Sequence, residues 1–308
     1  MLGGLVVVQM FTLIVITGPT GSGKTDVAVS VAKELGCDII SADSRQIYRG
    51  IPVITAAPSQ SQLEAVRHHF VGCLDLSEYY SAACFESDVL ALIGRLKARG
   101  DRYAVMCGGS MMYVDAVVRG LDDLPAISDD VRCDVLELYN NGGLEALREE
   151  LRVSDPEYLA VADVNNHRRL IHAVEIIRQS GCKFSSLRSG VVRERSFRTL
   201  KYAVDMPREE LFARINWRVE AMVAAGMEEE ARSVYHLRGL NSLNTVGFKE
   251  MFAYFDGEMD RDTAIARMAK NTRVYAKKQL TWLRRDQSVR WVTHASDILP
   301  AVMRDLHE

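Results

Sequence analysis

The sequence predicts an α/β protein in which a doubly wound parallel sheet carries an all-helical insertion. Before about residue 110, short apolar runs alternate with segments of helical spacing; from about residue 124, helical segments follow one another without a convincing strand. Alternating strands and helices are typical of parallel sheets, which bind ligands at the carboxyl ends of their strands. We therefore expect a core domain of residues 1–124 and 198–308, interrupted by a helical domain of residues 125–197.

The strands of this core are expected where β-branched apolar runs end at a turn signal. Residues 11–17 (FTLIVIT) end at Gly18, and residues 103–107 (YAVMC) end at a glycine pair. Residues 37–41 form another buried run, and residues 200–206 resume the strand pattern behind the insertion. Helical spacing predicts helices at residues 24–35, 85–97, 129–139, 144–151, 156–161, 165–180, 208–225, 227–237, 248–255 and 261–284.

The composition is that of a soluble globular protein. The 308 residues are 48% hydrophobic and 26% charged, and no fixed-period repeat interrupts them. The opening run Leu2–Ile16 is apolar, but no basic residue precedes it. We expect a leading extension and then a strand, with Met10 as an alternative start, rather than a signal peptide or a membrane span. Six cysteines without a Cys-x-x-Cys pair argue against a zinc site and indicate reduced thiols, so we expect a cytoplasmic protein. We also expect it to act as a monomer.

The formal net charge of −3 conceals an uneven distribution of charge along the chain. Residues 164–201 hold nine Arg or Lys against two acids, and residues 261–290 do the same. The two segments together carry +14, and the remainder of the chain carries −17. Such segregation favours a groove that binds a polyanion. The alternative is that both segments are solvated helical faces.

Residues 18–25 (GPTGSGKT) match the pattern G-x-x-x-x-G-K-[ST] between a predicted strand and a predicted helix. In this context the glycines let backbone N–H groups converge on phosphate oxygens, the lysine supplies a positive charge, and the last hydroxyl can hold Mg²⁺. The pattern predicts a P-loop NTPase-like core that binds a phosphate chain, without naming the reaction. The predicted phosphate ligands are Gly18, Pro19, Thr20, Gly21, Ser22, Gly23, Lys24 and Thr25, with Thr25 as the metal ligand.

Residues 41–48 (SADSRQIY), directly behind the second strand, place a carboxylate one strand away from the phosphate loop. Asp43 is therefore expected to accept a proton from a nucleophile that faces the bound phosphates. In a kinase or an ATPase, an acid at this place holds Mg²⁺ through water, and that role stays open for Asp43. A third alternative is that Asp43 or Ser44 only caps a helix.

These motifs resemble the bacterial-type tRNA dimethylallyltransferases, also called the IPP transferase family. The resemblance runs from about residue 13 to residue 292, with its blocks in the family's order. The blocks are GPTGSGKT (18–25), ISADSRQIYRG (40–50), RHHFVGCLD (67–75), CGGSMMY (107–113), HRRLIHAVEI (167–176), PREELFARINWRVEAM (207–222), TVGFKEM (245–251) and NTRVYAKKQLTWLRR (271–285).

The resemblance implies a reaction and a set of catalytic residues. A dimethylallyl group would pass from dimethylallyl diphosphate to the exocyclic N6 amine of the adenosine that is 3′-adjacent to the anticodon of tRNA, and diphosphate would be released. Asp43 would accept the proton of the amine. Arg218, together with Mg²⁺, would neutralise the leaving diphosphate. Ser110 stands where the family usually has a threonine near the target base, and it keeps the hydroxyl group.

The resemblance also implies an RNA surface, because the target adenine stacks in an anticodon loop and must be extruded. Arg168 and His172 replace a glutamine and an arginine of the family's RNA-contacting pattern, and Ala57 stands where the family has a lysine. The predicted contacts with the tRNA anticodon stem-loop are Asp43, Ser44, Arg45, Gln46, Ser110, Arg132, Arg168, Arg169, His172, Lys249, Arg273, Lys277 and Lys278. In the last long helix, Met268, Tyr275 and Trp282 recur every seven residues and are expected to face the core.

Three other functions stay open at this point. A small-molecule kinase would bind ATP at the phosphate loop, but it leaves the two basic segments unexplained. A transferase acting on free adenine nucleotides would need neither the helical insertion nor the +14 charge. A regulatory GTPase or a binding ATPase is disfavoured because the sequence contains no Asn-Lys-x-Asp motif, and the predicted strand at residues 103–107 lacks a terminal acid.

Overall fold

The computed structural model describes residues 10–188, 190 and 192–307. The predicted leading extension, up to residue 9, lies outside these ranges. Within them, six parallel strands form one sheet in the order β3-β2-β4-β1-β5-β6. No helix of the described ranges is both long and apolar enough to cross a membrane. The predicted α/β class with its parallel sheet is confirmed.

The predicted strands are present, with bounds shifted by two residues or fewer. They are β1 (Thr12–Thr17), β2 (Ile39–Ser41), β4 (Tyr103–Gly108) and β5 (Arg198–Val204). Two edge strands, β3 (His68–His69) and β6 (Val289–Val292), were not predicted, because both are short and mostly only half-buried. β1 pairs with β4 and β5 along its whole length, so the phosphate loop leaves the sheet from a central strand.

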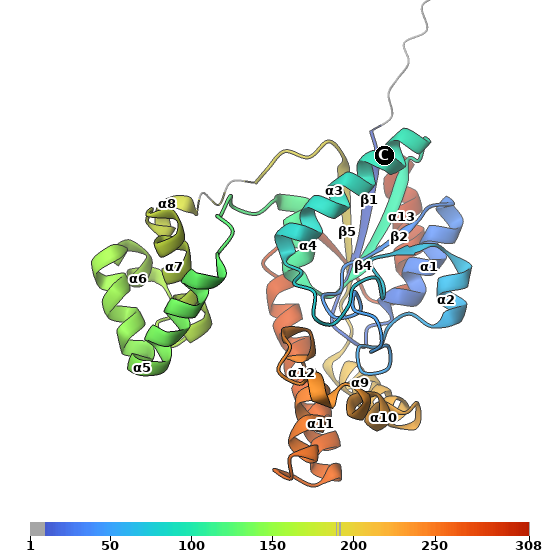
Figure 1. The fold of residues 1–308 in the computed structure, drawn as a ribbon. Coiled ribbons are helices and arrows are strands. Elements are labelled where there is room, and N and C mark those ends of the chain that lie inside the picture. The colour runs from blue at the N-terminus through green and yellow to red at the C-terminus, as the bar shows by residue number, and fades with distance from the viewer. Residues whose placement is uncertain (1–9, 189, 191, 308) are drawn as a thin grey trace, which may run out of the picture. The chain divides into compact units, whose positions relative to one another are not determined.

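Helices cover both faces of the sheet (Figure 1). Successive side chains of a strand point to opposite faces. Leu13 and Val15 of β1 therefore join the core beneath α3 (Ala82–Arg99) and α4 (Met111–Arg119). Ile14 and Ile16 join the core beneath α1 (Lys24–Leu35) and α13 (Ile298–His307), which follows the short turn η3 (Ala295–Asp297). This alternation explains why β1 is apolar throughout.

The helices that follow β5 pack on one another and on the loop behind β2. They are α9 (Arg208–Ala224), α10 (Met227–Ser233), α11 (Phe248–Phe255) and α12 (Arg261–Leu283), with the short turns η1 (Tyr235–Leu237) and η2 (Asn241–Leu243) between α10 and α11. Their common core includes Ile47, Ile51 and Ile54, which lie between β2 and α2 (Gln60–Ala65). At Gly247 a Cβ atom would lie 2.5 Å from Ile54 Cγ2, so the close approach of α11 requires glycine.

The chain divides into two compact units, of which the second is Gly120–Arg193. The sequence pattern places the helical insertion at residues 125–197. The helices of the second unit are α5 (Asp129–Ser154), α6 (Pro156–Val161), α7 (His167–Ser180) and α8 (Phe184–Leu187). They enclose a core of their own around Leu147, Leu170 and Val174. Gly143 has non-helical backbone angles inside α5, which accounts for the separate helices predicted on either side of it.

The predicted apolar seam of α12 is wrong for Tyr275. Met268 is buried and Trp282 is half-buried, but 39% of the surface of Tyr275 is exposed. Residues seven apart lie on nearly the same side of a helix, but how deeply each is buried depends on the segments that pack over it. The buried side continues instead through Ala276 and the polar Gln279, which the sequence pattern did not indicate.

A buried ion pair joins β5 to the segment behind α12. Lys201 is buried, and its Nζ atom lies 2.5 Å from Asp286 Oδ2. Burial alone would raise the pKa of Asp286, but the hydrogen bonds from Lys201 and Ser288 lower it to about 2. This folded-state pKa lies below the ordinary value of 3.8, so the pair stabilises the fold at neutral pH and loses its effect as the pH falls towards 2.

We expect Asp286→Asn to lower the free energy of unfolding by about 3 kcal/mol at neutral pH, because Lys201 is left buried without its partner. Urea unfolding measures the effect, and the double variant with Lys201→Met should recover most of the loss. The difference between wild type and Asp286→Asn should shrink as the pH falls from about 5 to about 2. Equal stability of both proteins at pH 7 would contradict this account of the pair.

Candidate active site

The phosphate loop connects the end of β1 to the start of α1. Gly23, the N-cap residue of α1, has φ 81, a left-handed conformation that favours glycine. The backbone N–H of Ser22 donates to the carbonyl oxygen of Pro19 at 3.2 Å, which closes the loop on itself. A Cβ atom at Gly21 would lie 3.1 Å from a side-chain carbon of Ile215, so α9 packs directly on the loop.

Two cations lie at this loop without an acidic partner. Lys24 Nζ donates to the carbonyl oxygen of Pro19 at 3.3 Å, and Arg218 Nη1 donates to Thr20 Oγ1 at 3.2 Å. Burial is the main cause that lowers the pKa of Lys24, and it also lowers the pKa of Arg218. Among the described residues, neither cation forms a salt bridge. Desolvated charges are costly unless they are paired, so the loop is built to receive an anion.

Arg214 is a third cation at the loop, and the sequence reasoning missed it. A Cβ atom at Gly23 would lie 3.1 Å from Arg214 Nη2, and the charge of Arg214 contributes to lowering the pKa of Arg218. Arg214 Nη1 lies 3.9 Å from Glu210 Oε1, so this ion pair is a long one. The available signal was its spacing, because residues i and i+4 lie on the same side of a helix and Arg214 precedes Arg218 by four.

The second half of the loop carries two further hydroxyl groups, those of Ser22 and Thr25. Ser22 Oγ is buried and forms no hydrogen bond in the described structure. Thr25 is half-buried at the start of α1. Among the described residues, no group of three or more acidic, histidine or cysteine side chains is arranged so that it could hold a metal ion. Mg²⁺ usually takes few protein ligands and completes its shell with phosphate oxygens and water, so a single hydroxyl beside a bound diphosphate fits this ion.

Asp43 and Ser110 lie on turns that follow neighbouring strands, β2 and β4. Ser110 Oγ accepts a hydrogen bond from the backbone N–H of Ser44 at 2.9 Å, and the N–H of Ser110 donates to the carbonyl oxygen of Ala42 at 3.1 Å. A Cβ atom at Gly108 would lie 2.1 Å from that same oxygen, so only glycine permits the two turns to meet. The structure thus brings Asp43 and Ser110 together, as the resemblance implied.

The Asp43 carboxylate combines a capping role with a free oxygen. Its Oδ1 atom accepts hydrogen bonds from the backbone N–H groups of Arg45 (2.9 Å) and Gln46 (3.2 Å). Within the described structure, no hydrogen bond uses its Oδ2 atom. Burial lowers the pKa of Lys24, and the charge of Asp43 opposes this shift. Asp43 is half-buried, so a substrate can still reach it.

Two of the predicted RNA contacts have side chains that already stabilise the fold. Arg45 Nη1 donates to the carbonyl oxygens of Asn241 and Ser242 at 2.6 and 3.0 Å, which ties the β2 turn to η2. Gln46 Nε2 donates to the carbonyl oxygens of Thr55 and Ala56 at 3.1 and 2.9 Å. These bonds shape the loop that carries Ala57, at the position where the family has a lysine.

The other predicted RNA contacts fall in both units of the chain. In the helical unit, Arg168, Arg169 and His172 are exposed on α7, and Arg132 lies in the first turn of α5. In the core unit, Lys249 on α11 and the pair Lys277 and Lys278 on α12 are exposed. Arg273 Nη1 donates to Asn216 Oδ1 at 2.5 Å. Arg208, Arg273 and Lys277 surround the ring of Phe212, each within 6 Å of its centroid.

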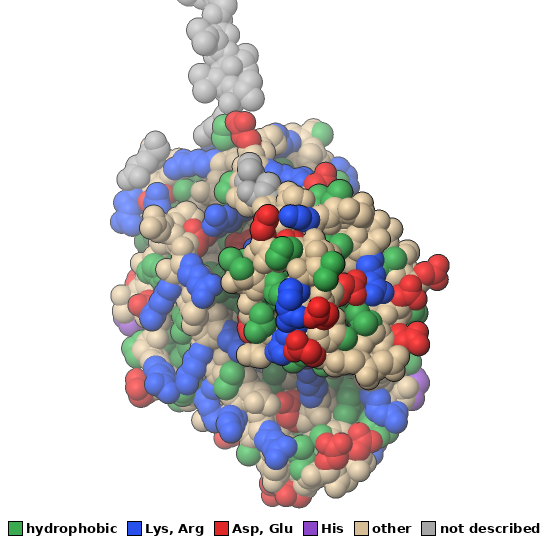
Figure 2. All heavy atoms as spheres, turned by 90° about the vertical axis from the view of Figure 1, so that its left-hand side faces the viewer, with side chains coloured by type: hydrophobic (Ala, Val, Ile, Leu, Met, Phe, Trp, Pro, Cys, Tyr) green, Lys and Arg blue, Asp and Glu red, His purple; other side chains and the backbone are tan. Residues whose placement is uncertain are grey.

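Part of the basic excess counted in the sequence is neutralised by acids from other segments. Arg195 of the first basic segment pairs with Glu86 in a buried contact. Arg261 pairs with Glu228. A charge count along the chain cannot show such pairs, because their partners are distant in sequence. Figure 2 nevertheless shows many Lys and Arg side chains exposed on the face that it presents.

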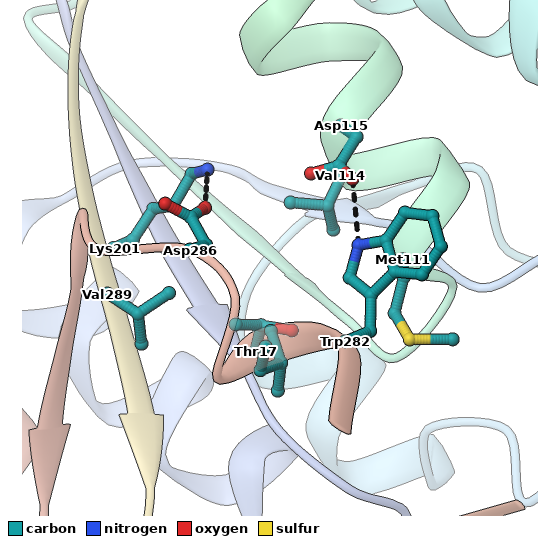
Figure 3. A pocket seen from close by; sticks show the side chains of 9 residues that line it. Thr17, Met111, Val114, Asp115, Lys201, Trp282, Asp286 and Val289 are labelled. Carbon is teal, nitrogen blue, oxygen red and sulfur yellow. Dashed lines mark hydrogen bonds and ion pairs between the residues drawn. The ribbon is translucent and has the colours of Figure 1, made fainter. Parts of the chain in front are cut away.

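A small pocket lies beside the end of β1 (Figure 3). Trp282 Nε1 donates to Asp115 Oδ2 at 2.8 Å across it, which connects α12 to α4. Burial raises the pKa of Asp115, and the Trp282 hydrogen bond opposes this shift. The residues that line the pocket are Thr17, Met111, Val114, Asp115, Lys201, Trp282, Leu283, Asp286 and Val289. None of the predicted phosphate or RNA ligands is among them.

A strand–loop–helix unit that is ready for an anion, with a carboxylate turn beside it, defines an α/β protein of the P-loop class. A sequence model described as IPP transferase matches residues 46–286. The chain belongs to this family. The match begins after the phosphate loop and Asp43, so the family assignment does not depend on these two motifs.

The relatives that the chain resembles support this membership. It is 48% identical over 280 residues to tRNA dimethylallyltransferase 1 of Phocaeicola vulgatus, with 91% of this chain and 93% of the relative covered. A full-length tRNA isopentenylpyrophosphate transferase of Bacillus halodurans is 33% identical, with a TM-score of 0.71 and 96% and 97% of the two chains covered. A eukaryotic dimethylallyltransferase described as acting on tRNA is 25% identical, with a TM-score of 0.74 and 89% and 70% coverage.

Proposed function

We propose that the protein transfers a dimethylallyl group from dimethylallyl diphosphate to the N6 amine of the adenosine that is 3′-adjacent to the anticodon of tRNA. One observation carries the proposal: among the described residues the desolvated cations Lys24 and Arg218 form no salt bridge, and the charge of Asp43 acts on Lys24. A diphosphate supplies the missing charge. The family membership and the names of the relatives favour this transfer over a kinase or GTPase reaction.

The reaction joins a weak nucleophile to a carbon with a good leaving group. The amine of adenine attacks the allylic carbon while the bond from that carbon to oxygen breaks, and the electron pair leaves with the diphosphate. The proton of the amine passes to Asp43, the general base. Lys24, Arg218 and Arg214 would stabilise the growing charge on the diphosphate, with Arg218 able to bind two oxygens at once. Mg²⁺ held beside Thr25 would supply further charge neutralisation when bound.

The acceptor base needs a surface to stack on once it has left the anticodon loop. Tyr275 offers an accessible aromatic ring on α12, one helical turn before Gln279. Burial raises the pKa of Tyr275 to about 12, and the charge of Asp43 adds to this shift. A neutral tyrosine ring would suit stacking against the purine, because stacking does not depend on a charged group.

In the core unit, the exposed cations of α11 and α12 would bind the anticodon stem-loop, and the α7 cations of the helical unit stay predicted RNA contacts. Action as a cytoplasmic monomer also stays a prediction. With about four phosphate contacts, we expect the affinity for the stem-loop to fall roughly 50-fold between about 50 and 200 mM salt. The double variant Arg273→Gln and Lys277→Gln should bind more weakly and show a shallower salt dependence. A filter-binding series at several salt concentrations measures both slopes. A flat response of the wild type would contradict an RNA surface made of these cations.

Substitution of the donor separates this function from its rivals. The wild type is incubated with an unmodified anticodon stem-loop, Mg²⁺ and either dimethylallyl diphosphate or ATP. We expect one C5H8 group to be added to the RNA with dimethylallyl diphosphate and no reaction with ATP. Phosphoryl transfer or hydrolysis with ATP, without prenyl transfer, would overturn the proposal in favour of a kinase or an ATPase. Equal transfer to free adenosine monophosphate would remove the need for RNA.

A further inference from the structure

Gln279 is a buried polar residue in the middle of α12, and 2% of its surface is exposed. Its Oε1 atom accepts a hydrogen bond from the backbone N–H of Thr20 at 2.8 Å. Its Nε2 atom donates to the carbonyl oxygen of Gly109 at 2.8 Å. Both ends of one amide are therefore used, and each bonds to the backbone of a different loop that is more than 160 residues away in sequence.

The two loops that Gln279 joins carry the two halves of the proposed reaction site. Thr20 belongs to the phosphate loop, and its hydroxyl accepts the hydrogen bond of Arg218. Gly109 precedes Ser110, whose hydroxyl bonds to the turn that carries Asp43. One side chain thus bridges the proposed diphosphate site and the turns that carry Asp43, the proposed general base. Within the described structure, no backbone hydrogen bond directly joins residues 18–23 to residues 109–110.

The fit around Gln279 leaves little freedom. A Cβ atom at Gly109 would lie 2.3 Å from Gln279 Nε2, so the amide occupies the space of a missing side chain. Three residues further along α12, the Trp282–Asp115 hydrogen bond fixes the helix to α4. α12 is therefore fixed to α4, and the Gln279 amide connects this helix to both loops.

We propose that Gln279 is the positioning residue that sets the spacing between the diphosphate loop and the Asp43–Ser110 turns. The proposal rests on the proposed function for its chemistry, but the bridge itself is a property of this chain. A displacement of about 1 Å between reacting groups can cost about a hundredfold in rate. Loss of the bridge should therefore lower kcat, while the affinity for RNA should stay unchanged, because the cations proposed to bind it, Lys277 and Lys278 on the same helix among them, are exposed and take no part in the bridge.

The variant Gln279→Glu tests the bridge through its pH dependence. An ionised carboxylate can accept from the Thr20 N–H, but it cannot donate to the Gly109 carbonyl. A protonated carboxyl group can do both, as the amide does. We expect kcat at least about tenfold below wild type at pH 8, with the ratio of variant to wild type rising as the pH falls to about 6. Gln279→Met, which has neither group, should lose activity with a ratio that does not change with pH.

The controls separate positioning from a general loss of structure. Gln287→Glu makes the same chemical change at an exposed glutamine and should leave kcat and its pH profile as in the wild type. The dissociation constant for the stem-loop should stay within about twofold in every Gln279 variant. A Gln279→Glu enzyme with wild-type kcat at pH 8, or with a ratio that does not vary with pH, would overturn the proposal.

Binding of inorganic diphosphate with Mg²⁺ judges the bridge independently of the reaction. We compare the diphosphate affinity of Gln279→Glu with that of the wild type at the same pH. Calorimetry should show a larger loss of affinity at pH 8 than at pH 6. Unaltered diphosphate binding at both pH values would count against the bridge. If the wild type binds diphosphate but transfers no prenyl group, the proposed function fails, and the calorimetric comparison alone decides on Gln279.

Discussion

Replacing Asp43 by asparagine is expected to lower turnover at least about a hundredfold and to leave RNA affinity within about twofold. The asparagine side chain keeps an oxygen that can accept the N–H groups of Arg45 and Gln46, so the turn should stay folded. What is lost is the carboxylate oxygen that would take the proton of the amine. Single-turnover transfer to a stem-loop, followed by mass analysis, measures the chemical step apart from product release.

The matched control for this variant is Asp88→Asn, an exposed change on α3 whose side chain can still accept the hydrogen bond of Tyr80. It should transfer at the wild-type rate. If Asp43 only caps the turn, Asp43→Asn should behave like this control. Turnover of Asp43→Asn within about threefold of wild type would therefore remove Asp43 from the role of base.

Replacing Lys24 by methionine is expected to lower kcat/KM for dimethylallyl diphosphate about a hundredfold or more. The ammonium group is desolvated at the loop and has only the Pro19 carbonyl oxygen as a hydrogen-bond partner in the described structure, so its charge is available for the diphosphate. Methionine keeps most of the length of the side chain but supplies no charge. Steady-state kinetics with varied donor concentration measures the loss.

Lys33→Met serves as the control, because Lys33 is exposed in the last turn of the same helix. It should leave kcat/KM unchanged. Because the variant removes a desolvated charge, its thermal stability should be no lower than that of the wild type. A Lys24→Met enzyme that is stable but also as active as wild type would show that the leaving group binds elsewhere.

The sheet and the phosphate loop could be predicted because their signals are local. β1 is apolar on both sides since both of its faces are covered, and the glycines of residues 18–25 are spaced for one backbone shape. The edge strands β3 and β6 could not be found this way, because strands of two and four residues are too short to show a periodicity. Register and strand order depend on contacts between distant segments, which one sequence does not display.

Sequence motifs name some residues of the candidate site, whereas others stand out only in the folded structure. Asp43, Ser110 and Arg218 lie in recognisable blocks, and the structure brings the first two together and places the third on Thr20. Gln279 lies in a block as well, but a glutamine on a basic helix suggests exposure, whereas its two backbone partners bury it. Tyr275 was assigned to the core because its spacing matched apolar neighbours rather than because of any contact.

The most direct test of the central claim, a purine amine that attacks between the Asp43 carboxylate and the diphosphate loop, is the choice of acceptor atom. Two stem-loops are compared under single-turnover conditions with dimethylallyl diphosphate and Mg²⁺: one with adenosine 3′-adjacent to the anticodon, the other with purine riboside, which lacks the exocyclic amine. Fragment mass spectra should place the prenyl group on N6 of the adenosine and show no product with purine riboside. Prenylation of both RNAs, or at a ring nitrogen, would contradict the account.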